Sequence, residues 1–193
     1  GDLRDVQSLR DGMRGRVFLQ PQGPESAAPF YPPHDGELYY SLTEFELSIG
    51  FSPTEFTQVN PAVNAVLVRR AMALLQPQGG ERVADMFCGI GNFSLTIARS
   101  GASVVGIEGS RSLVVRARSN AVRNGLGDLA EFKQANLFEI DAGQLAALGR
   151  FDRMLIDPPR DGAIGLIRAL GADAPGRIVY VSCSPATLAR DAG

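Results

Sequence analysis

Short apolar runs alternate with stretches of helical spacing from about residue 56 to the end of the chain. The apolar runs have the length of strands and lie at 82–87, 103–108, 130–136, 153–157 and 177–183. Helical spacing is found at 60–76, 92–100, 111–124, 142–148 and 163–172. Strands and helices that alternate at these lengths form a parallel sheet with helices on both faces. The sequence therefore predicts a doubly wound α/β fold.

Residues 1–55 have a different texture, rich in proline, glycine and aromatic side chains. The stretch "FLQPQGPESAAPFYPPHDG" is typical of a loop, and two alternating segments within "ELYYSLTEFELSIGF" predict a short hairpin. Too few apolar residues are present there to enclose a core. We therefore expect a partial β-rich subdomain over residues 1–55 and an α/β domain over residues 56–193.

Composition narrows the class of protein. Hydrophobic residues make up 45% of the chain and charged residues 21%, and no apolar run is long enough to span a membrane. Residues 1–12 lack the apolar core of a signal peptide, and the chain has only two cysteines, so we expect a cytoplasmic location. The net charge of −2 argues against a surface that coats nucleic acid in general, although a local basic patch stays possible.

The stretch "DMFCGIGNF" begins in the first apolar run and continues past its end, at the edge of the sheet where such folds bind ligands. Gly89 and Gly91 would let the backbone approach a ligand closely at the start of a helix. Ser94 replaces the third glycine of the dinucleotide fingerprint, whereas Glu108, 17 residues after Gly91, can accept both hydroxyls of a ribose. This combination favours a nucleoside cofactor without a pyrophosphate, S-adenosylmethionine. The alternative is a tight turn followed by a surface glutamate.

The third and fourth apolar runs also end in polar residues. Asn136, in "QANLF", could contact an adenine or simply form a turn. In "LIDPPRDGA", two prolines hold an extended backbone after Asp157. Methyltransferases of amino groups have an aromatic residue after these prolines, but here Arg160 follows, which could orient an oxygen or stabilise negative charge. A structural turn with a surface arginine is the alternative.

Cys183 lies where the last apolar run meets a helix, in "IVYVSCSPATLARD". Ser184 can cap that helix and Pro185 suits its first turn, so the sulfur would lie beside a helix N-terminus, which favours the thiolate. We therefore expect Cys183 to be a nucleophile. The alternative is a buried structural cysteine.

The other cysteine and the single histidine are not expected to take part in chemistry. Cys88 is predicted to pack as a small apolar side chain. A disulfide to Cys183 is not expected, because an intervening strand would separate the two by about 9–10 Å, beyond the limit of about 7 Å between α-carbons. His34, in the proline-rich stretch, is expected at the surface, so that no Ser-His or Cys-His pair is available.

Six stretches of the chain, taken in order, resemble the bacterial RNA uracil-C5 methyltransferases, in particular the branch that acts on a uridine of 23S ribosomal RNA. They are "FTQVNPAVNAVLV", "DMFCGIGNFSL", "VVGIEGS", "FKQANLFE", "LIDPPRDGA" and "YVSCSPATLARD". The resemblance implies the Rossmann-like class I fold of methyltransferases that use S-adenosylmethionine. The implied cofactor contacts, which join Gly89 and Gly91 of the glycine-rich turn, are Gln58, Phe87, Asn92, Glu108, Asn136 and Asp157. The implied nucleophile is Cys183, and Arg160 occupies the family's arginine position.

In that family the cysteine adds to C6 of uracil, and C5 of the covalent adduct takes the methyl group. The resemblance implies an RNA (uracil-5-)-methyltransferase with a ribosomal RNA substrate, no membrane, and a monomeric full-length protein. It also implies segments outside residues 1–193: an RNA-binding domain with an iron–sulfur cluster before them, and two strands with a glutamate base after them. The alternatives are an NAD-dependent dehydrogenase and a catalytically inactive RNA-binding or assembly module with the same fold.

Overall fold

The computed structural model describes residues 17–21, 27–31, 37–55, 57–58, 60–171 and 174–193. The chain divides into two compact units, of which one comprises Gly1–Tyr39 with Gly50–Thr57 and the other Tyr40–Ile49 with Gln58–Gly193. The assignment of residues 1–55 to one subdomain stays a prediction. His34, expected at the surface, lies outside the described residues.

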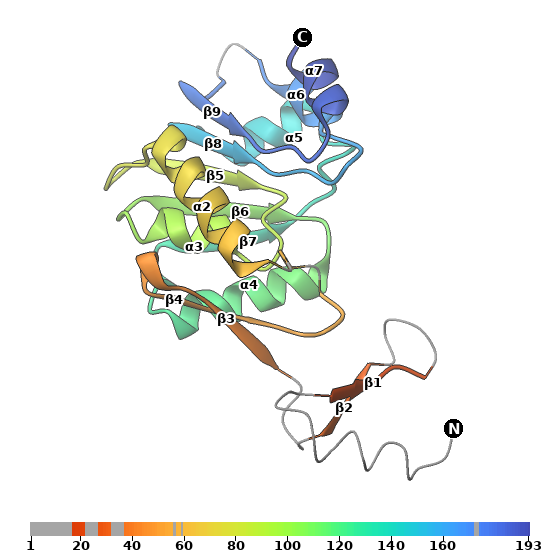
Figure 1. Cartoon of the computed structure of the whole chain (residues 1–193). Helices are drawn as coiled ribbons and strands as arrows, with labels where there is room; N and C mark the ends of the chain where they lie inside the picture. Colours follow the sequence, from red (N-terminus) through yellow and green to blue (C-terminus); the bar gives the residue numbers. More distant parts are fainter. Residues whose placement is uncertain (1–16, 22–26, 32–36, 56, 59, 172–173) are drawn as a thin grey trace. The chain divides into compact units, whose positions relative to one another are not determined.

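The larger unit is built on a parallel sheet of five strands in the order β7-β6-β5-β8-β9 (Figure 1). Its strands are β5 Arg82–Met86, β6 Ser103–Glu108, β7 Ala130–Gln134, β8 Arg153–Ile156 and β9 Arg177–Tyr180. The chain runs outward from β5 to β7 and then returns to the other side of β5, so the switch in strand order lies between β5 and β8. This confirms the predicted doubly wound α/β fold.

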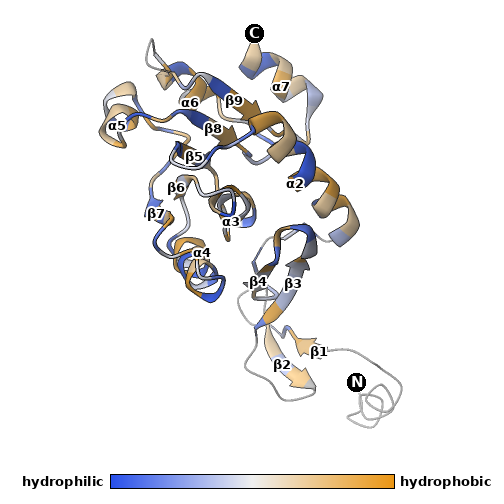
Figure 2. Ribbon diagram, turned by 90° about the vertical axis from the view of Figure 1, so that its left-hand side faces the viewer, coloured by the Kyte–Doolittle hydropathy of each residue, from blue (hydrophilic) through white to orange (hydrophobic). Residues whose placement is uncertain are grey.

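Helices connect the strands and cover the sheet. They are α2 Pro61–Leu75, α3 Asn92–Ala98, α4 Arg111–Arg123, α5 Ala142–Ala147, α6 Ile164–Ala169 and α7 Pro185–Ala192. Figure 2 shows α2 and α3 on one side of the sheet and α5 on the other. Helix α6 is shorter than the predicted stretch 163–172, because the backbone is already extended at Leu170 and Gly171 follows.

Strand β5 shows how the sheet is held between its two helical layers. Successive residues of a strand point to opposite faces. Ala84 and Met86 are fully buried on the face that packs against Leu145 of α5. Asp85 lies between them and meets Ser94 of α3 on the other face. Burial of a large apolar side chain contributes about 1.5–3 kcal/mol, so this packing fixes the strand end from which the site is built.

Two small sheets precede the parallel sheet in the sequence. Strand β3 Leu38–Leu42 pairs with β4 Leu47–Phe51, with the 3₁₀-helix η2 Thr43–Phe45 between them, which confirms the predicted hairpin. Strand β1 Val17–Leu19 pairs antiparallel with β2 Ala28–Tyr31, so the prediction of a loop throughout this stretch is wrong. A two-stranded ribbon leaves one side of each strand unpaired, and Pro29, which has no N–H, is therefore tolerated in β2.

The chain turns sharply between β9 and α7. The strand ends three residues before Cys183, so the prediction that it runs as far as the cysteine is wrong. The Ser182 hydroxyl donates to the carbonyl of Ser184 at 3.0 Å and accepts from its N–H at 3.1 Å, and these local bonds end the strand. Ser184 caps α7 as predicted, because its side chain accepts from the N–H of Thr187. Cys183 therefore lies in the turn directly before a helix N-terminus.

Candidate functional site

The glycine loop, residues 87–91, connects β5 to α3 along a tightly wound path. Phe87, Gly89 and Gly91 all have positive φ angles, of 64°, 54° and 94°. Glycine adopts such angles freely, but for Phe87 they are a form of strain that concentrates at functional sites. A Cβ on Gly89 would meet no atom within 4 Å, so the backbone there faces open space. The loop can therefore bring main-chain groups close to a ligand.

Glu108 ends β6 and points its carboxylate at the glycine loop. One of its oxygens accepts from the N–H of Gly89 at 3.1 Å, and the other accepts from the N–H of Ser110 at 2.9 Å. The structure thus brings together the two features from which the sequence predicted a nucleoside site. Each carboxylate oxygen has a further lone pair, so Glu108 can still accept from hydroxyl groups.

Two further carboxylates lie at the ends of β5 and β8. Asp85 is fully buried; its Oδ2 accepts from the Ser94 hydroxyl, while its Oδ1 has no hydrogen-bond partner among the described residues. Burial raises the pKa of Asp85 to about 7, and the charges of Asp157 and Glu108 add to the rise. Burial also raises the pKa of Asp157 to about 6. A ligand with a positive charge would stabilise the ionised forms of these carboxylates.

Asn92, a predicted cofactor contact, is held by two residues that the sequence patterns did not reveal. Its side-chain carbonyl accepts from the Tyr40 hydroxyl at 2.9 Å and from the Asn64 amide at 3.1 Å. Its own amide donates to the Asn64 carbonyl at 3.0 Å. A signal for Asn64 was present, because it interrupts the buried face of α2 that continues with Val68 and Leu75. A buried amide at such a position needs polar partners.

The side chain of Asn136 forms a local turn after β7. Its carbonyl accepts from the N–H of Phe138 at 3.1 Å, and its amide donates to Glu139 at 2.9 Å. These contacts fit the alternative of a turn-forming asparagine, and a cofactor contact stays a prediction. Phe138 packs edge-on against Phe87, with ring centroids 5.4 Å apart, so the turn borders the glycine loop. Gln58, in the segment before α2, is exposed.

The two cysteines have opposite environments. Cys183 is exposed, whereas Cys88 is only 5% exposed, and both are free thiols. Burial raises the pKa of the Cys88 thiol well above its ordinary value. The prediction of a core role for Cys88 is confirmed, and the alternative of a buried Cys183 is wrong. The sulfur of Cys183 is therefore accessible to a substrate.

The proline loop, residues 157–163, carries Arg160 beside helix α7. Arg160 is exposed, and its carbonyl accepts from the Thr187 hydroxyl of α7 at 3.1 Å. At the start of the loop, the N–H of Asp157 donates to the carbonyl of Met86 at 3.2 Å. The loop connects β8 to α6, and on its way it contacts both the end of β5, where the glycine loop begins, and the helix that follows Cys183.

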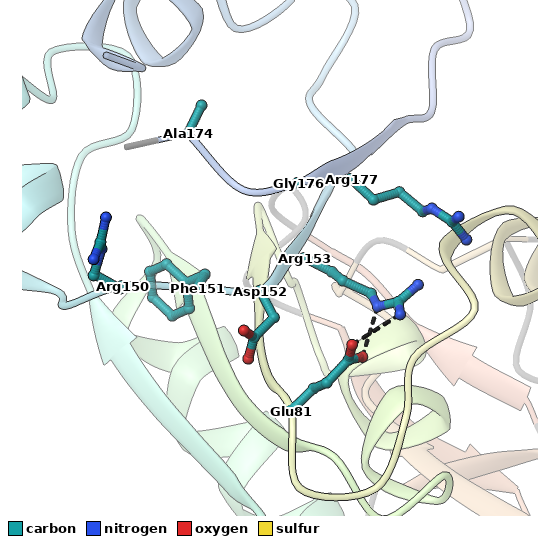
Figure 3. Close-up of a pocket in the computed structure, with 8 residues that line it drawn as sticks. All are labelled: Glu81, Arg150, Phe151, Asp152, Arg153, Ala174, Gly176 and Arg177. Carbon is teal, nitrogen blue, oxygen red and sulfur yellow. Dashed lines mark hydrogen bonds and ion pairs between the residues drawn. The ribbon is translucent and has the colours of Figure 1, made fainter. Parts of the chain in front are cut away.

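A cavity of about 600 Å³ lies at the opposite edge of the sheet, where β8 and β9 begin (Figure 3). Arg153 and Glu81 line it and form two hydrogen bonds of 2.6 and 2.8 Å, so their charges compensate each other. Ligands of doubly wound sheets bind at the carboxyl ends of the strands. The candidate site is therefore the edge formed by the glycine loop, Glu108, the proline loop and Cys183.

The chemical groups of the candidate site are main-chain amides, carboxylates, side-chain amides, an arginine and a thiol. Among the described residues, no group of three or more His, Cys, Asp or Glu side chains is placed to hold a metal ion. None of the helices in that part of the chain is long and apolar enough to cross a membrane.

Comparison with known proteins relates most of the chain to one family. The family model described as tRNA (Uracil-5-)-methyltransferase matches residues 41–192. The 23S rRNA (uracil(1939)-C(5))-methyltransferase RlmD of Dechloromonas aromatica is 65% identical over 91% of this chain, and its namesake from Azoarcus sp. is 59% identical over 99%. The chain spans 40% and 44% of the lengths of these two relatives.

Solved structures share the fold. The tRNA (uracil-54, C5)-methyltransferase of Pyrococcus abyssi, in complex with S-adenosyl-L-homocysteine, is 32% identical with a TM-score of 0.70, over 82% of this chain and 37% of that one. TrmN from Thermus thermophilus is 25% identical with a TM-score of 0.55, over 65% of this chain and 40% of its own. These likenesses confirm the predicted Rossmann-like methyltransferase fold.

Proposed function

Since the chain belongs to the tRNA (Uracil-5-)-methyltransferase family, we propose that the protein transfers a methyl group to C5 of a uridine in 23S ribosomal RNA. The family description names tRNA, so the choice of RNA depends on the relatives. The two relatives named for 23S rRNA are 65% and 59% identical, whereas the Pyrococcus abyssi tRNA enzyme is 32% identical. The greater similarity favours ribosomal RNA as the substrate, and with it a cytoplasmic location.

The methyl donor in this proposal is S-adenosylmethionine, which supplies, when bound, a methyl group on a positively charged sulfur. The residues present fit such a molecule. The backbone at Gly89 faces open space, Glu108 has lone pairs for ribose hydroxyls, and the buried Oδ1 of Asp85 has no partner among the described residues. The carboxylates also favour a positively charged ligand. The residues proposed to hold the donor are Gln58, Phe87, Gly89, Gly91, Asn92, Glu108, Asn136 and Asp157.

Cys183 supplies the chemistry that uracil lacks, because C5 alone is a weak nucleophile. The thiolate adds to C6, so that a C–S bond forms and the electrons of the C5=C6 bond move towards C5 and O4. C5 then takes the methyl group. A base removes the proton from C5, and the thiolate leaves as the C5=C6 bond re-forms. One methyl group enters, one proton leaves, and Cys183 is regenerated.

Arg160 stabilises the negative charge that develops on the uracil during this addition. Its guanidinium is exposed on the proline loop, and the loop is tied to α7, the helix that follows the nucleophile. Hydrogen-bond donors placed at a developing charge contribute a factor of about 10²–10³ to the rate.

The observation that carries the proposal is the exposed Cys183 thiol in the turn before α7, at the edge of the sheet that holds the glycine loop. In the full-length protein, Cys183→Ala should abolish 5-methyluridine formation in 23S RNA, measured by mass spectrometry of nucleosides. Binding of S-adenosylmethionine, measured by calorimetry, should stay within about twofold of wild type, because the cysteine is not among the proposed donor contacts. Residual methylation by Cys183→Ala would contradict the role of Cys183 as the nucleophile. A wild-type protein that binds RNA but forms no 5-methyluridine would favour the inactive RNA-binding module.

A further inference from the structure

Asp191, in the last turn of α7, is a carboxylate with no exposed side-chain surface. Its Oδ2 accepts from the N–H of Ala163 at 2.7 Å and from the Tyr180 hydroxyl at 2.6 Å. Its Oδ1 accepts from the Nε and Nη2 of Arg190 at 2.8 and 2.6 Å. Burial alone would raise the pKa of Asp191, but these hydrogen bonds outweigh it and bring the pKa below its ordinary value. One ionised carboxylate thus joins the proline loop, strand β9 and helix α7.

Helix α7 binds the proline loop through two further side chains. The Thr187 hydroxyl donates to the carbonyl of Arg160 at 3.1 Å, and Nη2 of Arg190 donates to the carbonyl of Asp161 at 2.8 Å. Gly162 lies between Asp161, whose carbonyl Arg190 binds, and Ala163, whose N–H Asp191 binds. Its φ is 82°, and a Cβ there would overlap the side chains of Asp191 and Thr187. The backbone of the loop is therefore held tightly against the helix on both sides of Gly162.

The same helix begins two residues after Cys183, with Ser184 as its cap, so a short turn connects the nucleophile to the groups that bind the proline loop. We propose that Asp191 is a positioning residue, which fixes the loop that carries Arg160 relative to the Cys183 sulfur. The proposal rests on the methyl transfer proposed above. A displacement of about 1 Å between reacting groups can cost a factor of about 10² in rate, so loosening the loop should slow the reaction without removing any group that touches the substrate.

The test compares Asp191→Asn with a matched control in the full-length protein. Asparagine keeps the size of the side chain but removes its charge and one of its two acceptor oxygens. Asp161→Asn is the control, because the Asp161 carboxylate is exposed on the same loop and only its carbonyl accepts from Arg190. Asp191→Asn should lower kcat at least tenfold when kcat is normalised to the amount of protein that binds S-adenosylmethionine. The KM for that donor should stay within about twofold of wild type. Asp161→Asn should retain the wild-type kcat.

A second variant keeps the proposal testable if Asp191→Asn does not fold. Tyr180→Phe removes one hydrogen bond to Asp191 and should lower kcat by about threefold to tenfold. If either variant unfolds at a lower temperature but keeps the wild-type kcat, normalised to the amount of protein that binds the donor, the role of Asp191 is merely structural and the proposal is overturned. Cys183→Ala is measured in parallel. Activity of Cys183→Ala overturns both proposals, whereas an inactive Cys183→Ala beside a fully active Asp191→Asn overturns the positioning role alone.

Discussion

Replacing Asp85 by asparagine should stabilise the folded protein most at alkaline pH. Asp85 is 0% exposed, and its pKa is about 7 in the folded protein against 3.8 for an unperturbed carboxyl. A carboxyl with a higher pKa in the folded state binds its proton more tightly there than in the unfolded state. Its contribution to stability is therefore full below about pH 4 and is lost as the pH rises through about 7. Asparagine has nearly the same shape and no charge to bury.

The magnitude follows from the two pKa values. The difference of about 3 between them corresponds to about 4 kcal/mol at about 1.4 kcal/mol for each pH unit. The unfolded carboxyl is already largely ionised at pH 5, so about 2–3 kcal/mol of this change falls between pH 5 and pH 8. Burial raises the pKa of Asp157 to about 6 in both proteins, and the charge of Asp157 enters the comparison through its part in raising the pKa of Asp85.

Urea unfolding of wild type and Asp85→Asn at pH 5 and pH 8 measures this effect. The stability of the variant relative to wild type should be about 2–3 kcal/mol greater at pH 8 than at pH 5. Asp128→Asn is the control, because Asp128 is exposed in the segment before β7, and it should show no such difference. The same relative stability of Asp85→Asn at both pH values would refute the reasoning. Binding of S-adenosylmethionine should weaken in Asp85→Asn, since the site loses a negative charge.

Two further predictions concern the core and the cysteines. Alkylation of the native protein, followed by peptide mass spectrometry, should modify the exposed Cys183 and leave Cys88, which is 5% exposed, protected until the protein unfolds. Equal labelling of both in the native protein would contradict the burial of Cys88. Gly106→Ala should destabilise the fold by about 1–3 kcal/mol in urea unfolding, because its Cβ would lie 2.6 Å from a ring carbon of Phe132 and 2.9 Å from the Cys88 sulfur. An unchanged unfolding midpoint would contradict this packing.

The elements of the fold that the sequence predicts correctly are those that depend on local residue patterns. The five strands of the parallel sheet were predicted because strands of such sheets are almost continuously apolar where both faces are buried, as in "SVVGIE" of β6. The end of β9 was not predicted, because it depends on a side chain. The Ser182 hydroxyl forms hydrogen bonds with both the carbonyl and the N–H of Ser184, and these bonds end the strand early. Strands β1 and β2 were missed because their proline-rich surroundings resemble a loop. Each of these two strands is formed by pairing with the other, so neither segment predicts a strand by itself.

The site was predictable where its residues lie in compact motifs at strand ends. Glu108 and Gly89 illustrate this, since one ends an apolar run and the other follows one, and parallel strands bring such ends to the same edge. The residues that hold the motifs in place were missed. Tyr40 is 52 residues from its partner Asn92, and Asp191 is 28 residues from Ala163. Contacts over such separations depend on how helices and strands pack, which periodicity does not specify.

The covalent role of Cys183 is tested most directly by trapping the adduct. Fluorine at C5 cannot leave as a proton, so a 5-fluorouridine that has been attacked at C6 and methylated at C5 stays bound to the sulfur. The full-length protein is incubated with S-adenosylmethionine and a 23S RNA fragment that carries 5-fluorouridine. We expect a protein–RNA complex that survives denaturing electrophoresis, with peptide mass spectrometry placing the RNA on Cys183. The absence of a complex from an active enzyme, or attachment through another residue, would contradict this role.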